Sequence, residues 1–378
     1  MRAGRGAVVY NVTWAEPDLV ARRLLALALA RMSFLKPRER YQLLRRCRLA
    51  EFADYSLIQL ALLLRRRLGL RRRLPPPAAW LERARADQDH LTGGGLGGTF
   101  LWEPDYPRIL REIHDPPGVL FWRGARRLPA SAAPVAVVGT RQPTGAGRCA
   151  AFRFGFDLAL KGVPTVSGLA RGVDLEAHRG SLAGWRGAGW GGGCATVAVL
   201  GCGIDRIYPS SSRRVAREVV RQGWLVSEFP PGTAPFAHHF PLRNRIIAGL
   251  SRGVLVVEAP ARSGALITAC CAADEGREVA VAAAALGGPR GTGTRGLAES
   301  GAVSVAHADE LLQEFGLSTG HGRRAPRAGR TAAAARPVST PPARHRAPGA
   351  WLAHLFALEQ ERRVASSHGS FAVAEEQD

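Results

Sequence analysis

The sequence predicts an α/β protein with an extended Rossmann-like, doubly wound and mostly parallel sheet, preceded by a small helical module. Continuous apolar runs of four to seven residues are typical of strands that are buried on both faces of a parallel sheet. Most of these runs lead into a helical pattern, which is the rhythm of βαβ units. Six runs carry the prediction: VAVVG (135–139), VPTVSG (163–168), TVAVLG (196–201), WLVSE (224–228), GVLVVEA (253–259) and EVAVAA (278–283).

The chain of 378 residues is long enough for one large core with a smaller domain or tails, and 46% of its residues are hydrophobic. We expect a basic helical N-terminal module at 1–85 and a Rossmann-like domain with a short lead-in segment at 86–316. A disordered basic linker should follow at 317–350, because this stretch contains no acidic residue and too few apolar residues for a core. The remaining residues, 351–378, should form a short helix or tail.

The formal net charge of +21 favours a polyanionic partner. Only Lys36 and Lys161 are lysines, and so much arginine, together with abundant Ala, Gly and Pro, is typical of GC-rich codon usage. The positions of particular arginines are therefore more informative than the total. The six cysteines form no CxxC pair and no metal-ligand spacing, so we expect reduced thiols and no metal.

The N-terminus lacks the apolar run of a signal peptide. The most apolar early stretch, LLALALA (24–30), is too short to span a bilayer. We therefore predict a cytoplasmic protein that has no membrane contact.

Four strand ends carry small residues and lead into a helix: GTRQPTGAG (139–147), SGLARGVD (167–174), GCGIDRIYP (201–209) and RSGALIT (262–268). Exposed N–H groups at helix N-termini bind phosphate oxygens, and glycine allows close approach. In doubly wound sheets the ligand binds beyond these strand ends. The pattern predicts an anionic, phosphate-bearing ligand, with the loops shaped around it by Gly139, Arg141, Ser167, Gly168, Ser263 and Gly264.

The stretch FPLRNRIIAGLS (240–251) places Arg243, Asn244 and Arg245 at the start of a predicted helix. Cations at that position oppose the helix dipole, but they become favourable beside a bound phosphate. The alternative is that these arginines pair inside the protein with Glu228 or Glu258. This alternative applies most strongly to Arg245, which lies closer to the apolar face.

No catalytic constellation stands out. Ser167 and His178 lie in one strand–turn–helix segment whose spacing does not suit a nucleophile and its base. The first strand leads into GTRQPTG, which differs from the GxGxxG fingerprint of dinucleotide-binding proteins. We therefore expect neither a cofactor nor enzymatic activity.

Several blocks, in this order, resemble the DNA-processing protein A family (DprA, also called Smf). They are YPRILREIHDPPGVLFWRG, VAVVGTR, SGLARGVDLEAH, TVAVLGCGIDRIYP, LVSEFPPGTAPFAHHFPLRNRIIAGLS and VLVVEAPARSGALITA. The similarity covers about residues 104–305, and FPLRNRIIAGLS is its most specific block. The resemblance implies a Rossmann-like domain that binds single-stranded DNA without catalysis. It also implies protection of incoming DNA, help in loading RecA recombinase during natural transformation, and a homodimer.

Carried onto this chain, the resemblance assigns DNA contacts to Arg141, Ser167, Gly168, Phe240, Arg243, Asn244 and Arg245. A single strand is held by a basic groove along its phosphates, with bases stacked on aromatic planes. Phe240, Phe236 or Tyr208 would supply such planes. The alternative for Phe240 is a place in the core.

The chain also departs from the family pattern. It carries a Gly/Trp-rich insertion at 184–195, Ser212 in place of the usual asparagine, and Arg295 in an altered last loop. The segment after the linker is too short for the winged-helix domain of many members. Two other functions were weighed: a nucleotide phosphoribohydrolase of the lysine-decarboxylase-like family, with Glu299 as the acid beside the sugar, and a decayed member kept for protein interaction.

Overall fold

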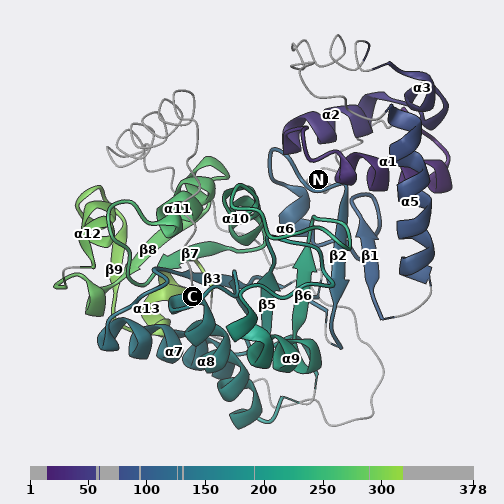
Figure 1. Ribbon diagram of the computed structural model, residues 1–378. Helices are drawn as coiled ribbons and strands as arrows, with labels where there is room; N and C mark the ends of the chain where they lie inside the picture. The colour runs from purple at the N-terminus through teal and green to yellow at the C-terminus, as the bar shows by residue number, and fades with distance from the viewer. Residues whose placement is uncertain are drawn as a thin grey trace, which may run out of the picture.

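The computed structural model confirms the predicted fold class. One sheet of nine strands, counted over the described residues, has the order β1-β2-β6-β5-β4-β3-β7-β8-β9, and helices cover both of its faces (Figure 1). The structure describes residues 15–56, 59, 76–92, 95–125, 127–129, 132–190, 192–288 and 290–317. Apart from Leu317, the predicted basic linker and C-terminal helix lie outside these residues.

The six predicted strands all form, and they are β3 to β8. Their bounds are β3 Val135–Val138, β4 Thr165–Ser167, β5 Thr196–Val199, β6 Trp224–Ser227, β7 Gly253–Val256 and β8 Glu278–Ala282. Three further strands were not predicted: β1 Gly97–Phe100, β2 Val119–Arg123 and β9 Val303–Val305. The strands from β6 to β9 in the sheet order pair in parallel, whereas β1 and β2 add an antiparallel edge beside β6.

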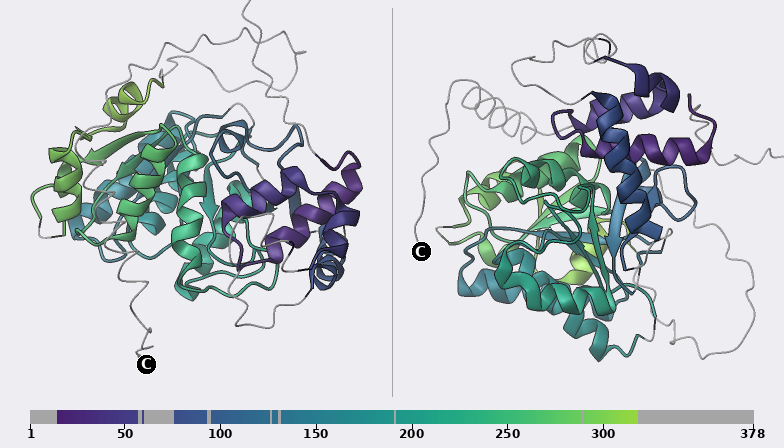
Figure 2. Two further views of the ribbon diagram at one scale, coloured as in Figure 1. Left: turned by 90° about the horizontal axis from the view of Figure 1, so that it is seen from above. Right: turned by 45° about the vertical axis from the view of Figure 1, so that its right-hand side comes forward.

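The helices fall into an N-terminal group and a group that flanks the parallel strands. The first group comprises α1 Leu19–Arg31, α2 Pro37–Arg46, α3 Leu49–Asp54 and α5 Pro77–Thr92. It packs at the β1–β2 end of the sheet in every view (Figures 1 and 2). The second group comprises α6 Arg108–Arg111, α7 Gly145–Leu160, α8 Val173–Gly187, α9 Arg213–Gln222, α10 His239–Gly249, α11 Gly264–Asp274, α12 Thr292–Glu299 and α13 Ala308–Glu314.

Alternation along the strands divides the core into two layers. In β3, Val135 and Val137 pack with residues of α7, α8 and α13, whereas Ala136 and Val138 pack with residues of α6, α10 and α11. Successive side chains of a strand point to opposite faces, so both faces of this strand must be apolar. The continuous apolar runs in the sequence are therefore explained by burial of both faces of these strands.

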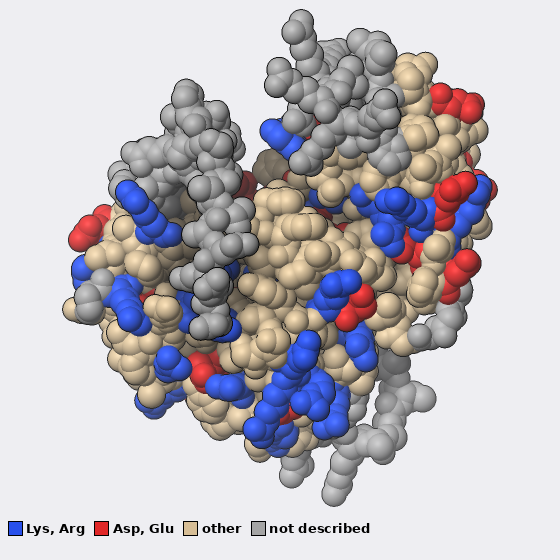
Figure 3. Space-filling model, in the orientation of Figure 1, with Lys and Arg blue, Asp and Glu red and all other residues tan. Residues whose placement is uncertain are grey.

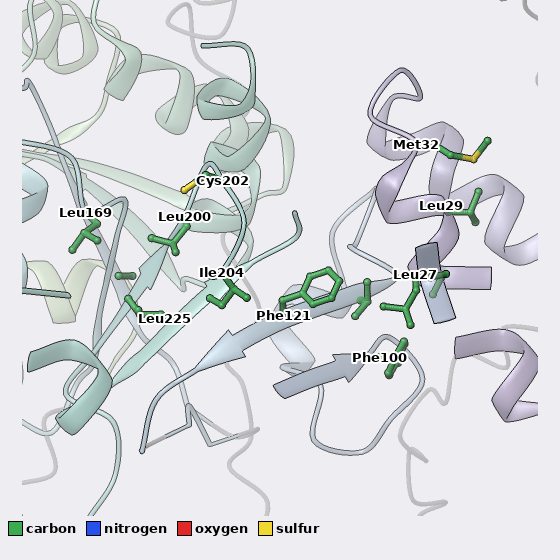
Figure 4. Close-up of a cluster of buried hydrophobic side chains, with 14 of the residues drawn as sticks. Leu27, Leu29, Met32, Phe100, Phe121, Leu169, Leu200, Cys202, Ile204 and Leu225 are labelled. Atoms are coloured by element: carbon green, nitrogen blue, oxygen red, sulfur yellow. The ribbon is translucent and has the colours of Figure 1, made fainter. Parts of the chain in front are cut away.

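A third cluster joins the N-terminal helices to the sheet. Leu27 and Leu29 of α1, and Met32 directly after it, belong to the same buried cluster as Phe100 of β1 and Phe121 of β2 (Figure 4). The same cluster continues to side chains after β5 and on β6, which are Leu200, Cys202, Ile204 and Leu225 (Figure 4). The N-terminal helices and the sheet thus share one continuous core.

Helices α7 and α8 approach each other unusually closely. A Cβ atom on Gly180 would lie 2.0 Å from the carbonyl oxygen of Phe152, and one on Gly184 would lie 2.3 Å from that of Phe156. Only glycine fits at such distances. The insertion at 184–195 extends α8 and then folds back, because the indole of Trp190 donates a hydrogen bond of 3.0 Å to the carbonyl oxygen of Ala159.

The direction of winding changes at β3. The chain runs outward through β3, β4, β5 and β6, and then crosses to place β7 on the other side of β3. The helix that follows β3 and the helix that follows β7 lie on opposite faces of the sheet. A crevice therefore opens between them, beyond the carboxyl ends of these two strands. The fold therefore places the loops after β3, β4 and β7 around one position.

A buried charge cluster holds α10 against the N-terminal helices. The guanidinium of Arg245 forms an ion pair with Glu228, donates a hydrogen bond of 2.7 Å to the carbonyl oxygen of Asp115, and lies 3.7 Å from the Asp115 carboxylate. Arg40 of α2 lies 3.9 Å from Glu228. Although burial alone lowers it, the neighbouring Glu228 and Asp115 carboxylates raise the pKa of Arg245 above its ordinary value. Arg245 thus takes the internal partner that was weighed as its alternative.

Replacing Arg245 by alanine should lower the free energy of unfolding by about 3–5 kcal/mol, since it leaves the buried Glu228 carboxylate with only the more distant Arg40 and the half-buried Asp115 carboxylate without its cation. Guanidinium-induced unfolding, followed by circular dichroism, measures this change. Arg141→Ala is the matched control, because Arg141 is exposed and its loss should change the free energy by less than about 0.5 kcal/mol. Equal losses in the two variants would contradict the structural role of the Arg245 cluster.

Candidate nucleic-acid interface

A hollow of about 450 Å³ opens at the crevice beyond β3 and β7. The loops after β3, β4 and β7 line it, together with the first turns of α10 and α11. Seven of the predicted site residues lie along its wall: Gly139, Arg141, Phe240, Arg243, Asn244, Ser263 and Gly264. The fold therefore brings together residues that are more than one hundred positions apart in the chain.

Three predicted site residues do not line the hollow in the described structure. Arg245 faces Glu228 and Asp115 in the buried cluster. Ser167 is buried, and its hydroxyl donates a hydrogen bond of 2.7 Å to the carbonyl oxygen of Val137, which ties β4 to β3. Gly168 lies directly behind the wall, where it supports Arg243.

The rim of the hollow carries a cation beside an aromatic ring. Arg141 is exposed, and its guanidinium carbon lies 5.8 Å from the centre of the Phe240 ring. Phe240 is half-buried, and its ring centre lies 5.5 Å from that of Tyr208, which is 45% exposed. Phe240 therefore belongs neither fully to the core nor fully to the surface. Tyr208 is the more exposed ring of this aromatic pair.

The arginines of the FPLRNR block do not lie at a helix start. Helix α10 begins at His239, so Arg243 and Arg245 fall in its second turn. The helix dipole acts mainly within the first turn, and the expectation of an unfavourable cation at the N-terminus was therefore wrong. Burial, rather than the dipole, governs both side chains.

Arg243 is buried beneath the hollow and donates hydrogen bonds to two strand ends. Its Nη1 donates to the carbonyl oxygen of Gly168, at 2.8 Å, and to that of Val199. Burial lowers the pKa of Arg243 to about 10, while the nearby Asp174 carboxylate acts in the opposite direction. The guanidinium therefore remains protonated at neutral pH and adds positive charge to the wall.

Asp174 balances part of this charge. It lies in the first turn of α8, and its Oδ2 accepts a hydrogen bond of 3.1 Å from the N–H of Gly168. Burial raises the pKa of this carboxyl group, and Arg243 opposes the rise. The charged side chains that line the hollow are Arg141, Asp174 and Arg243, so cations outnumber anions there.

Helix α11 directs its N-terminus at the same hollow. Ser263 is its N-cap, and the Ser263 hydroxyl accepts a hydrogen bond of 3.2 Å from the N–H of Ala265. Gly264 is exposed, and no atom lies within 4 Å of the place where its Cβ would be. Asn244 links this helix to α10, because its Nδ2 donates to the carbonyl oxygen of Gly264 at 3.2 Å. The free space in front of Gly264 leaves room for an anion.

The N-terminus of α7 is already occupied by a carboxylate of the protein. Glu258 is buried, and its Oε2 accepts hydrogen bonds from the N–H of Thr144, at 2.8 Å, and from the Thr144 hydroxyl, at 3.2 Å. In dinucleotide-binding Rossmann folds the pyrophosphate lies at the N-terminus of the helix after the first strand. The internal Glu258 carboxylate takes that place here, which corrects the prediction that all four helix N-termini serve one ligand.

The phosphoribohydrolase alternative required Glu299 beside a bound sugar. Glu299 is exposed at the end of α12, and it does not line the hollow. Arg295 of the altered last loop donates to the carbonyl oxygens of Leu286, at 2.7 Å, and Gly288, at 3.0 Å. This arginine therefore stabilises its own loop, and Glu299, the acid that the enzymatic alternative names, lies away from the hollow.

Sequence reasoning named Glu258 only as a possible partner of the arginines, and it did not name Asp174. In the sequence, Glu258 is an acid at the end of a predicted strand and Asp174 is an acid at the start of a predicted helix. Neither position shows which group the carboxylate contacts. Their roles depend on contacts with Thr144 and Arg243, which come from other parts of the chain. In the described part of the chain, no three His, Cys, Asp or Glu side chains are grouped to hold a metal ion, and no helix has the length and apolarity to cross a membrane.

A methyl group at residue 168 should disturb the wall of the hollow. The Cβ of Gly168→Ala would lie 2.5 Å from Nη2 of Arg243, so the buried guanidinium would have to move from its carbonyl acceptors. We expect a loss of about 1–3 kcal/mol in the free energy of unfolding, as for other overpacked sites. Thermal unfolding compared with Gly264→Ala, which meets open space, measures it. A variant as stable as Gly264→Ala would contradict the tight seating of Arg243.

The chain is similar to a known protein family and to several of its members. The profile of the DNA recombination-mediator protein A family matches residues 98–316, which are more than half of the chain. DNA processing protein DprA of Streptococcus pneumoniae is 37% identical over 246 residues, covering 63% of this chain and 82% of that protein. Protein Smf of Synechocystis is 41% identical over 217 residues, covering 57% of this chain and 52% of that protein. The chain thus spans about half the length of this relative.

A solved structure shows the same fold. The X-ray structure of DNA processing protein A from Streptococcus pneumoniae superposes with a TM-score of 0.59 at 31% sequence identity, over 76% of this chain and 96% of that chain. The family match, the sequence relatives and this fold agree with the order of motifs along the sequence. The chain belongs to the DNA recombination-mediator protein A family, the DprA/Smf family.

Proposed function

We propose that this protein binds single-stranded DNA without catalysis, and that the hollow beyond β3 and β7 is the centre of the binding surface. The observation that carries the proposal is the pairing of exposed Arg141 with the half-buried ring of Phe240 at the rim. An exposed cation beside a partly exposed aromatic pair suits one phosphate and one base of a strand. Membership of a recombination-mediator family supports a nucleic-acid ligand.

Each rim element has a distinct part in this binding. Arg141 would pair with a phosphate, and the open N-terminus of α11 at Gly264 would receive phosphate oxygens. A base would stack on Phe240, or on Tyr208 beside it. Arg243 is a positioning residue, because its hydrogen bonds go to main-chain carbonyls while its charge favours an anion in the hollow.

The same geometry favours a single strand over a duplex. The rings of Phe240 and Tyr208 are reached only by a base whose face is free, and duplex bases are stacked on their neighbours. The hollow is also too small for a double helix to enter. We therefore infer that duplex DNA binds more weakly than a single strand of equal length.

The wider role follows from family membership and is part of the proposal. The protein would shield incoming single strands from nucleases, help load RecA recombinase during natural transformation and act as a homodimer in the cytoplasm. Nuclease digestion of a labelled strand, with and without the protein, tests the shielding. Static light scattering tests the dimer. Faster formation of RecA filaments in the presence of the protein tests the loading.

Two single substitutions should separate phosphate contact from base stacking. Arg141→Gln should reduce the slope of log affinity against log salt by about 0.7 for oligo-dT, as expected for one lost phosphate contact. Phe240→Leu should leave the slope unchanged and weaken binding by about 1–3 kcal/mol, the contribution of one stacked base. Fluorescence polarisation at several salt concentrations measures both quantities.

Arg148→Gln provides the matched control for the lost charge, because Arg148 is exposed on α7 and does not line the hollow. Thermal unfolding of all three variants confirms that each is folded. The proposal fails if Arg141→Gln and Arg148→Gln bind oligo-dT equally well, or if the wild-type protein prefers duplex DNA.

A further inference from the structure

Helix α9 presents one face of arginines to solvent. Val215, Ala216 and Val219 are buried against the sheet, and the opposite side carries four exposed arginines, which are Arg213, Arg214, Arg217 and Arg221. In the space-filling view, basic side chains gather over α9 and the end of α8, with little acidic surface between them (Figure 3). The net charge of the whole chain partly reflects its arginine-rich composition. The fold, however, gathers these four arginines on one face of a helix.

This face is not neutralised by its neighbours. The helix contains one acid, Glu218, and that carboxylate lies 3.0 Å from Arg186 of α8. Among the residues that the structure describes, no carboxylate lies within ion-pair distance of any of the four arginines. Their charge is therefore available to an external anion.

The arginine face begins at the edge of the hollow. Arg171 follows Ala170, a residue of the hollow's wall, and its Nε donates a hydrogen bond of 3.3 Å to the hydroxyl of Ser211, just before α9. The hydroxyl of Ser212 donates to the carbonyl oxygen of Leu169 at 3.0 Å. These contacts fix the start of α9 to the loop after β4. Tyr208, which packs on Phe240, lies on the same short connection.

We propose that the arginine face of α9 continues the DNA path from the hollow and binds phosphates of the same strand without regard to sequence. The inference rests on the proposed binding of single-stranded DNA. Arg213, Arg217 and Arg221 are spaced by four residues, so successive side chains are about 6 Å apart along the helix axis and share one side. Such a row suits the repeated charges of a nucleic-acid backbone.

A polyanion suits this face better than a protein partner. Protein interfaces have an apolar centre with charges at the rim. The exposed large apolar side chains of the described region are Leu19, Val20, Phe152, Leu160, Tyr208 and Phe236, and none of them lies on α9. The face offers charge alone, which is the requirement for phosphate contacts that carry no sequence information.

The experiment compares two lengths of oligo-dT. One is a short strand that spans only the hollow, and the other is a longer strand that extends beyond α9. The full-length triple variant Arg213→Gln, Arg217→Gln and Arg221→Gln should bind the short strand as the wild type does. Its salt slope for the longer strand should fall by about 2, from three contacts of about 0.7 each, and its affinity should fall on the order of 10- to 100-fold near 0.1 M salt.

Two controls make the result specific. A second triple variant replaces exposed arginines of the N-terminal helices, namely Arg38, Arg46 and Arg85, by glutamine, and it should retain the wild-type slope. A lysine version of the α9 variant keeps the charge and should restore most of the slope. Equal thermal unfolding of the variants excludes loss of the fold, because glutamine and arginine have similar helix propensities.

Three other outcomes would overturn either the extended DNA path or the proposed function. An α9 variant with the wild-type slope on the longer strand overturns the extended path and leaves the hollow as the binding surface. Equal losses on short and long strands also overturn it, because the contact would then lie within the hollow. A wild-type protein that binds neither strand overturns the proposed function together with this inference.

Discussion

The buried guanidinium of Arg243 is the contact on which the arrangement of the rim depends. A cation that is removed from water must be surrounded by oxygen atoms. Here they come from the carbonyls of Gly168 and Val199, at the ends of two neighbouring strands, and from the nearby Asp174. Because these carbonyls belong to the main chain, the guanidinium fixes the course of the backbone after β4 and β5 relative to α10. Arg141 and Phe240 can therefore be accessible to a ligand on a frame that is rigid beneath them.

The second feature is the use of the protein's own carboxylates at helix N-termini. Glu258 occupies the start of α7, and Asp174, in the first turn of α8, binds the N–H of Gly168 in the loop after β4. The start of α11, by contrast, faces open space at Gly264. In a nucleotide-binding relative of this fold, the first of these positions receives the ligand's phosphates. The hollow here is lined by the loop after β3 and extends to the starts of α10 and α11.

The sequence was sufficient to predict the parallel strands β3 to β8 and the loops that line the hollow. It could not show that Arg243 and Arg245 have different partners. Buried strands appear as continuous apolar runs, so β3 to β8 were predicted, whereas β1 contains two glycines and the edge strand β9 carries an exposed serine between its two valines. Arg243 and Arg245 stand two positions apart on one helix and meet different surroundings. The Asp115 partner of Arg245 lies 130 positions away. No local pattern carries such distant contacts, and the same limit hid the role of Glu258.

The glycine contacts between α7 and α8 have a consequence for how the molecule can be altered. Because no side chain separates the two helices at Gly180 and Gly184, α7 and α8 pack backbone against backbone and should move as one rigid unit. Helix α8 starts beside the hollow, and its fifteen residues place its C-terminal end about 22 Å from its start. The Gly/Trp-rich segment at its far end can therefore change in length without shifting the rim. Its exposed turn, rather than the buried Trp185 and Cys194, is a suitable attachment point for a reporter group.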